Sequence, residues 1–214
     1  TGLRVEAEKY GYTYVDVSPY EIFSNNVLTF DDIVRIKHAE DVLEKYWNAH
    51  RMDYTIEYLV EEVVETPFDF FQQFGTKRET KSWSRIGHQL DDLFKRLMEF
   101  LVTIPNIDLK IVQSIMQIDY LRSMKFNPRK FWWNERLTEE QLKEVMAPIR
   151  KNHALVNEKF ASFNISDKDL IKHSLVIPTY VDYEALTDGK VVSRKGHLFV
   201  YFFNGENPFL ATID

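Results

Sequence analysis

The sequence lacks cysteine altogether, and glycine and proline number only seven each among its 214 residues. Without a thiol, this chain can hold no disulfide, no thiolate zinc site and no cysteine-ligated iron–sulfur cluster. Few glycines and prolines mean few tight turns and long elements, which favours helices over many short strands. No apolar run of about 18 residues is present, so we expect no membrane-spanning helix.

The formal net charge is −6, and aromatic residues make up 14% of the chain. This charge argues against a uniformly basic nucleic-acid-binding surface. The length suffices for one large domain, or one domain with an appendage. Residues 1 to 20 lack the apolar stretch of a signal peptide, so the cytoplasm is the simplest compartment. Because the chain opens with Thr1, we expect it to be a piece excised from a longer protein.

The long amphipathic segment after residue 28 has a clear helix start. Thr29 and Asp32 have the spacing of a capping box, in which each side chain binds the other residue's backbone N–H. Apolar residues then recur at helical spacing. We therefore predict a helix from Phe30 to about His50.

A second start signal lies at Thr66 and Pro67, a cap residue followed by proline at the first helical position. The spacing of Phe68, Phe71 and Phe74 predicts that they line one side of this helix. Gly75 either ends the helix or lies within it.

The C-terminal stretch has a different composition. "SLVIPTYVDYEAL" and "VVSRKGHLFVYFF" are rich in β-branched and aromatic residues, and "TDGK" between them is a turn signal. We predict an antiparallel pair over about residues 175–203. The fold class is therefore mainly α, a multi-helix bundle-like domain with a short C-terminal antiparallel β element.

No residue pattern indicates a catalytic centre. The six histidines form no metal-binding pair at helical spacing, and no glycine-rich loop is suited to phosphate. Adjacent carboxylates such as Glu61 and Glu62 are typical of a solvent-facing helix surface. We assign no catalytic, cofactor-binding or metal-ligating residue, and an independent enzyme without a cofactor is one of three hypotheses.

The segment "MKFNPRKFWWNER", residues 124–136, interleaves four basic with four aromatic residues. Aromatic platforms with cations can bind single-stranded nucleic acid or a peptide. A recognition module that uses Phe131, Trp132 and Trp133 is therefore a second hypothesis. The alternative is a connecting loop whose aromatic rings cover the helical core while its lysines and arginines stay in water.

Several stretches, taken in order, resemble a known family. They are "TGLR", "EKYGYTY", "PYE" at Pro19–Glu21, "LTFDDIVRIK", "YWN" at Tyr46–Asn48, "TPFDFF" at Thr66–Phe71 and "DYL" at Asp119–Leu121. Together they resemble the region after the radical domain in bacterial cobalamin-binding radical S-adenosylmethionine proteins of the Fe–S oxidoreductase type. These proteins carry a C-terminal helical domain without an assigned function. The resemblance is close over about the first quarter of the chain and patchy beyond.

The resemblance implies a parent protein with an upstream cobalamin domain and a radical barrel. The parent would hold a four-iron four-sulfur cluster, S-adenosylmethionine and cobalamin, and would act on an unknown substrate. The cluster-binding cysteine loop and the usual cobalamin-contacting motif are both absent here, so no cofactor-binding residue is carried onto this chain.

By this resemblance, residues 1–28 would be the tail of the barrel and a linker, and residues 29–214 a helical accessory domain. The first hypothesis is that this domain docks on the barrel and shapes substrate access. Ordinary packing within the domain is the alternative role for the aromatic residues concerned. The candidate docking residues are Pro19, Tyr20, Glu21, Tyr46, Trp47 and Asn48.

Overall fold

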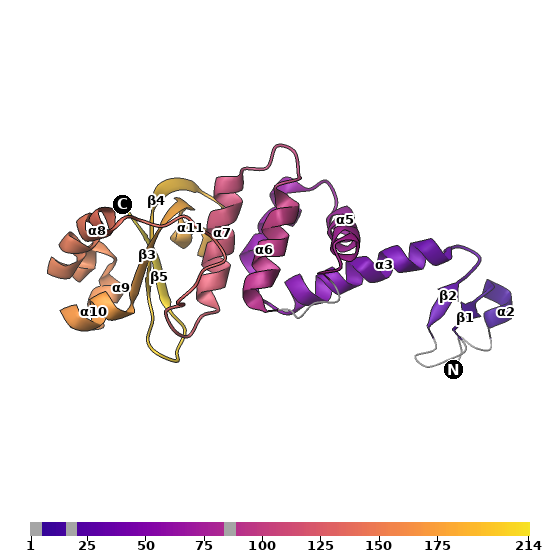
Figure 1. The fold of residues 1–214 in the computed structure, drawn as a ribbon, viewed down its shortest axis with the longest axis horizontal. Coiled ribbons are helices and arrows are strands. Elements are labelled where there is room, and N and C mark those ends of the chain that lie inside the picture. The colour runs from indigo at the N-terminus through magenta and orange to yellow at the C-terminus, as the bar shows by residue number, and fades with distance from the viewer. Residues whose placement is uncertain (1–5, 16–20, 84–88) are drawn as a thin grey trace. The chain divides into compact units, whose positions relative to one another are not determined.

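A computed structural model describes residues 6–15, 21–83 and 89–214. The chain forms two compact units (Figure 1). The first contains Thr1–Ala49 and Val64–Gly87, and the second contains His50–Val63 and His88–Asp214. The predicted fold class, mainly α with a small C-terminal antiparallel sheet, is confirmed. Among the described residues, no helix combines the length and apolarity needed to cross a bilayer.

The first unit is built on two packed helices, α3 and α5. Its elements are α2 (Ala7–Tyr10), β1 (Thr13–Tyr14), β2 (Ile22–Ser24), α3 (Phe30–Val42), η1 (Leu43–Asn48) and α5 (Pro67–Thr80). Strands β1 and β2 pair antiparallel just before α3 begins. This short pair lies within the segment predicted as a tail and linker.

The helix predicted from Phe30 is confirmed, with the capping box at its start. The Thr29 hydroxyl accepts a hydrogen bond from the backbone N–H of Asp32 at 3.2 Å, and Asp32 accepts one from the backbone N–H of Thr29 at 3.0 Å. The last six residues, η1, have π-helical geometry. Helical structure therefore continues to Asn48, two residues short of the predicted end.

Helix α5 begins as predicted, with Thr66 as its cap and Pro67 as its first residue. The predicted apolar side is partly wrong, because Phe68 is 53% exposed, whereas Phe70 is buried beside Phe71. Gly75 lies within the helix. A Cβ built on Gly75 would lie 2.3 Å from the carbonyl oxygen of His38, so glycine lets α5 approach α3 closely.

A buried arginine links the same two helices. Arg78 is 1% exposed, and its Nη1 donates to Asp41 Oδ2 at 2.7 Å. The guanidinium lies 5.3 Å from the centroid of the Tyr46 ring. Burial by itself would raise the pKa of Asp41, but Lys45 and Arg78 hold that pKa below its usual value. Asp41 therefore neutralises a cation that packing has removed from water.

The second unit places a three-stranded sheet between groups of helices (Figure 1). Its strands are β3 (Ser174–Val181), β4 (Ser193–Tyr201) and β5 (Phe209–Ile213). Its helical elements before the sheet begin with α4 (Asp53–Tyr58), η2 (Leu59–Val63), α6 (Leu90–Leu101), α7 (Leu109–Arg122) and α8 (Glu139–Lys151). Four further elements follow along the chain: η4 (His153–Leu155), α9 (Glu158–Ala161), α10 (Asp167–His173) and α11 (Tyr183–Thr187).

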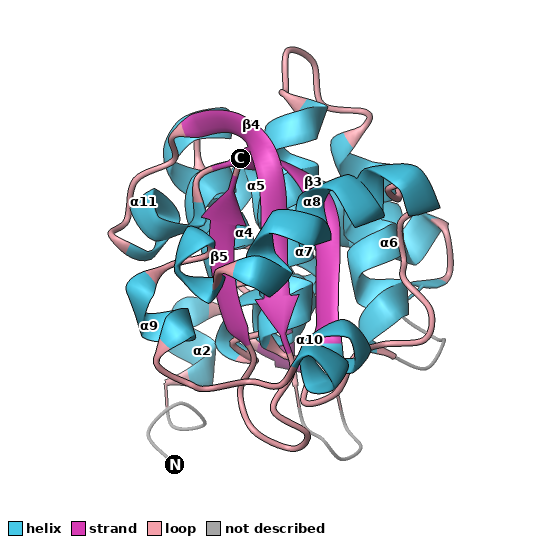
Figure 2. Ribbon diagram, turned by 90° about the vertical axis from the view of Figure 1, so that its left-hand side faces the viewer, coloured by secondary structure: helices cyan, strands magenta, loops and turns pink. Residues whose placement is uncertain are grey.

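Figure 2, which views the sheet from the side of α8 and α10, shows β4 between β3 and β5. The predicted antiparallel pair corresponds to β3 and β4, and Gly189 has the positive φ, 74°, that the turn signal indicated. The connection also contains α11. Strand β5 was not predicted, because four of its five residues are buried and the strand shows no alternation of apolar and polar residues.

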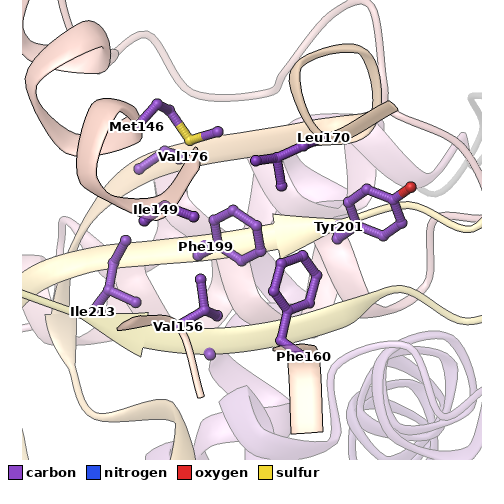
Figure 3. Close-up of a cluster of buried hydrophobic side chains, with 10 residues drawn as sticks. Met146, Ile149, Val156, Phe160, Leu170, Val176, Phe199, Tyr201 and Ile213 are labelled. Atoms are coloured by element: carbon purple, nitrogen blue, oxygen red, sulfur yellow. The ribbon is translucent and has the colours of Figure 1, made fainter. Parts of the chain in front are cut away.

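The face of the sheet toward α8, α9 and α10 carries a compact apolar core (Figure 3). Phe160 is its centre: its ring lies 4.9 Å from that of Phe199 and 5.6 Å from that of Tyr201. Met146 and Ile149 of α8 pack into the same core (Figure 3). Helix α7 packs on β3, where the Ser114 hydroxyl accepts the backbone N–H of Tyr180 at 3.0 Å.

Replacing Thr29 with Ala should lower the free energy of unfolding by roughly 1 kcal/mol, because the hydroxyl that accepts the Asp32 N–H and donates to the Asp32 carboxylate is lost. Chemical denaturation followed by far-ultraviolet circular dichroism measures this loss. Thr29→Ser is the control, since it retains the hydroxyl and should stay within about 0.5 kcal/mol of the wild type. Equal stability of Thr29→Ala and the wild type would contradict the capping role.

Replacing Gly75 with Ala should destabilise the protein by about 1–3 kcal/mol, although alanine is the better helix former, because the methyl group would force α5 away from the His38 carbonyl. Thr76→Ala is the matched control at the next, exposed position of α5 and should be neutral or slightly stabilising. The same chemical denaturation measures the stability of both variants. A Gly75→Ala variant more stable than the wild type would show that the helices do not pack this closely.

Candidate functional site

The second unit contains a polar pocket of about 320 Å³ at the N-terminus of α4 and the C-terminal end of α7. The start of α11 and the loop before β5 complete its wall. Its lining combines cationic, hydroxyl, amide and carboxylate groups with a small apolar surface. The lining residues are His50, Arg51, Asp53, Asp119, Arg122, Ser123, Tyr183, Asn207, Pro208 and Leu210.

The carboxylate of Asp119 is the most buried charged group of the pocket, at 4% exposure. One oxygen, Oδ2, accepts hydrogen bonds from the backbone N–H of Thr55 at 2.8 Å and from its hydroxyl at 2.7 Å. The other oxygen accepts a longer one, 3.4 Å, from the backbone N–H of Tyr54. Since Met52 supplies no side-chain cap, Asp119 of α7 takes over the capping of α4.

Burial raises the pKa of Asp119 to about 7, against the hydrogen bonds from Thr55 and the positive charge of Arg122, which act to lower it. Near neutral pH, part of the molecules therefore have a protonated Asp119 and part an ionised one. Burial also raises the pKa of Tyr183, and the nearby Arg122 opposes that rise.

Arg122 lies at the end of α7 with its guanidinium 4.3 Å from the centroid of the Tyr54 ring. Its Nη1 is 3.9 Å from Asp119 Oδ1, an ion-pair distance that is too long for a hydrogen bond. The aromatic stacking holds the guanidinium in place without using its N–H groups. The Arg122 side chain is 39% exposed, so these donors are accessible from the pocket.

The turn before α4 and the first residue of α4 bring three further polar residues to the pocket. His50 has a positive φ, 51°, a backbone conformation that residues other than glycine adopt rarely. Its Nδ1 lies 3.1 Å from Asp53 Oδ1. Arg51, next to it, is exposed and forms no hydrogen bond or ion pair with the residues that the structure describes.

The lining groups of this pocket can bind a charged or polar ligand. Asp119 is hydrogen-bonded to α4 and nearly inaccessible, and the pocket lining contains no activated nucleophile. Over the described ranges, no cluster of three or more histidine, aspartate or glutamate side chains could hold a metal ion.

The predicted docking residues have different environments. Pro19 and Tyr20, like "TGLR", lie outside the described residues, while Glu21 is exposed and forms an ion pair with Lys37. Tyr46 is fully buried. Of the remaining two, Trp47 is 37% exposed, and exposed Asn48 donates to Glu44 at 2.6 Å.

The aromatic residues of loop 124–136 are mostly core contacts. Trp132 and Trp133 are 8% and 5% exposed. The Trp132 ring stacks 5.6 Å from Phe94, and the Trp133 ring meets Tyr120 edge-on at 5.6 Å. Phe131 is half-buried. The two indole rings therefore cover the helical interior, while Phe126, at 59% exposure, is the aromatic ring of this loop that faces water.

At the start of α3, by contrast, apolar side chains are exposed to water. Phe23 and Phe30 stack with ring centroids 4.2 Å apart, yet they are 43% and 45% exposed. Val27 between them is 86% exposed. The side chain of Asn25 accepts the backbone N–H groups of Val27 and Leu28 at 2.8 and 2.7 Å, which fixes this turn. We call Phe23, Val27 and Phe30 the N-terminal patch.

Sequence reasoning missed the pocket and the N-terminal patch. For the pocket, one signal was available: Asp119 interrupts the apolar stripe of a helix, and it begins the "DYL" stretch that carries part of the family resemblance. A carboxylate at such a position has to find a buried partner. Nothing local pointed to Arg51 or Tyr183, which the fold brings to Asp119 from distant parts of the chain.

We expect Asp119 to make stability fall with rising pH. The pKa of Asp119 is about 7 in the folded protein and 3.8 in the unfolded chain, so the folded state binds more protons between these values. The contribution is fully present below the unfolded pKa and is lost as pH rises through the folded one. From pH 5 to pH 8 the free energy of unfolding should drop by roughly 2–3 kcal/mol on this account.

The measurement is urea denaturation at several pH values for the wild type and Asp119→Asn, in which this drop should be absent. Asp53→Asn is the control, because it changes an exposed carboxylate of the same pocket and should keep the slope of the wild type. Arg122, the charged group that acts on Asp119, is retained in both variants. An Asp119→Asn variant with an unaltered slope would refute the shifted pKa.

The sequence matches the family described as Protein of unknown function (DUF4080) over residues 8–200. No curated protein and no solved structure matches the chain. The matched span includes the N-terminal patch and most of the pocket lining, and ends before Asn207, Pro208 and Leu210. Since the match extends over most of its length, the chain belongs to the DUF4080 family of proteins of unknown function.

Proposed function

We propose that the chain is the C-terminal accessory domain of a cobalamin-binding radical S-adenosylmethionine protein. It docks on the radical barrel and shapes substrate access without supplying catalytic groups of its own. The ordered sequence stretches that resemble this family support the parent's identity. The observation that carries the docking role is the N-terminal patch.

An ordered turn that holds apolar side chains in water is a feature of interaction surfaces. Val27 is 86% exposed although the Asn25 side chain fixes its backbone. The patch also lies in the part of the chain where the family resemblance is closest. Burying the exposed part of the two stacked rings against a partner would add roughly 1 kcal/mol for each ring, since each is less than half exposed.

The distribution of exposed aromatic rings supports an interaction role for the first unit. In its described parts, the exposed aromatic residues are Tyr10, Phe23, Phe30, Trp47 and Phe68. In those of the second unit they are Phe126 and Phe163. The second unit is the longer one, so exposed rings are concentrated in the first.

In this proposal the parent's upstream parts hold the iron–sulfur cluster, S-adenosylmethionine and cobalamin. The accessory domain contributes a wall that positions the substrate and keeps water from a radical intermediate. Recognition of nucleic acid or a peptide by loop 124–136 has weaker support, because stacking needs exposed rings and both indoles are buried.

The test uses the intact parent, purified without oxygen, with its cluster and cobalamin. We expect Phe23→Ala to lower single-turnover product formation about tenfold while cluster content is unchanged, because docking of the domain is lost. Hydrogen exchange should also show protection of residues 22–30 in the parent that the separate chain lacks.

Phe126→Ala is the matched control, since it removes another exposed phenylalanine ring outside the N-terminal patch. Its turnover should remain within about twofold of the wild type. Equal effects of the two substitutions, or equal exchange of residues 22–30 in the parent and in the separate chain, would eliminate the docking role.

A further inference from the structure

We propose that the polar pocket of the second unit binds a small organic anion. The carboxylate or phosphate group of this ligand would lie between Arg51 and Arg122, and its apolar part would contact Tyr183. This proposal goes beyond the docking role, because the N-terminal patch belongs to the first unit and all the pocket residues belong to the second.

The first argument is that the cations of the pocket have unused donors. Arg122 stacks on Tyr54 and lies 3.9 Å from Asp119, but forms no hydrogen bond within the described part of the chain. Arg51 likewise has no partner among the residues described. Each guanidinium offers a planar array of donors that matches a carboxylate or a phosphate group.

The second argument is that the acidic groups of the pocket are already engaged. Asp119 directs Oδ2 to the backbone N–H and hydroxyl of Thr55, and Asp53 lies 3.1 Å from the His50 ring. These carboxylates therefore balance the local charge without saturating the arginine donors. A ligand anion can bind the arginines without displacing either contact.

The third argument is the character of the remaining wall. Lys125, from the basic loop 124–136, donates to the side-chain oxygen of Asn207, which brings a further positive charge beside the pocket. Tyr183, Pro208 and Leu210 add an apolar surface. A volume of about 320 Å³ lies at the small end of ligand pockets, so a ligand with a single ring or a short chain fits better than a nucleotide.

The fourth argument is that the arginine at the end of α7 is fixed before any ligand binds. Its guanidinium is held over the Tyr54 ring, and Tyr54 belongs to the helix that Asp119 caps. Fixing the donor group in advance reduces the entropy lost on binding.

The experiment is isothermal titration calorimetry of the chain with four probes: benzoate, phenyl phosphate, inorganic phosphate and benzyl alcohol, the uncharged counterpart of benzoate. We expect saturable binding of an aryl anion, weaker binding of inorganic phosphate, and none of benzyl alcohol. The tighter of the two aryl anions identifies the ligand group as carboxylate or phosphate.

Arg51→Ala should weaken binding of the aryl anion at least about tenfold, because a charge-assisted pair of hydrogen bonds is lost. This residue is exposed and has no described partner, so the variant should fold normally. Arg122→Gln, which removes the second guanidinium, should have a similar effect. Arg129→Ala is the control: Arg129 is exposed in the same unit but lies outside the pocket, and its removal should change affinity less than about twofold.

Two results would overturn the proposal. One is the absence of saturable binding of both aryl anions up to about 10 mM. The other is binding that Arg51→Ala and Arg129→Ala weaken equally, which would indicate a general charge effect rather than this pocket. Neither result would bear on the docking role, which is tested on the first unit and in the parent protein.

Discussion

The architecture of the second unit depends on one buried carboxylate. Asp119 lies on α7 and accepts hydrogen bonds from the first turn of α4, 64 residues earlier in the chain. The same helix holds the edge of the sheet through Ser114 and Tyr180. Helix α7 thus fixes both its helical neighbour and the sheet. Because a buried carboxylate is costly unless its hydrogen bonds are made, this geometry has little freedom to vary.

The sequence predicted those features whose interacting residues lie close together in the chain, such as the helix caps. A cap such as Thr29 bonds three residues away, so its signal and its partner lie in the same short window. The contacts of Asp119 and Arg122 join segments that are far apart in the chain, and no periodicity encodes them. Loop 124–136 shows how composition alone can mislead. Its mixture of basic and aromatic residues is typical of a binding surface, but in the folded chain both of its indole rings are buried. Strand β5 was not predicted because residues on both of its faces are buried, so its sequence does not alternate between apolar and polar residues.

The two units carry different kinds of surface. The first exposes apolar rings on a fixed turn, which suits a large partner surface that can cover them. The second presents two guanidinium groups with unused hydrogen-bond donors at a concave site, which suits a small charged ligand. A pocket of about 320 Å³ matches the size of a small ligand, whereas the stacked phenylalanine rings offer an apolar surface and no charged group. The two proposed roles therefore require different chemistry and do not compete for residues.

Asp119 would also couple an anion in the pocket to pH. Arg122 lowers the pKa of Asp119, while burial raises it to about 7. An anion bound to Arg122 adds negative charge beside the carboxyl, so it raises this pKa further and favours the protonated acid. By linkage, protonation of Asp119 must strengthen anion binding by the same free energy. The carboxyl that holds α4 in place is thus also the group through which proton binding and ligand binding would affect each other.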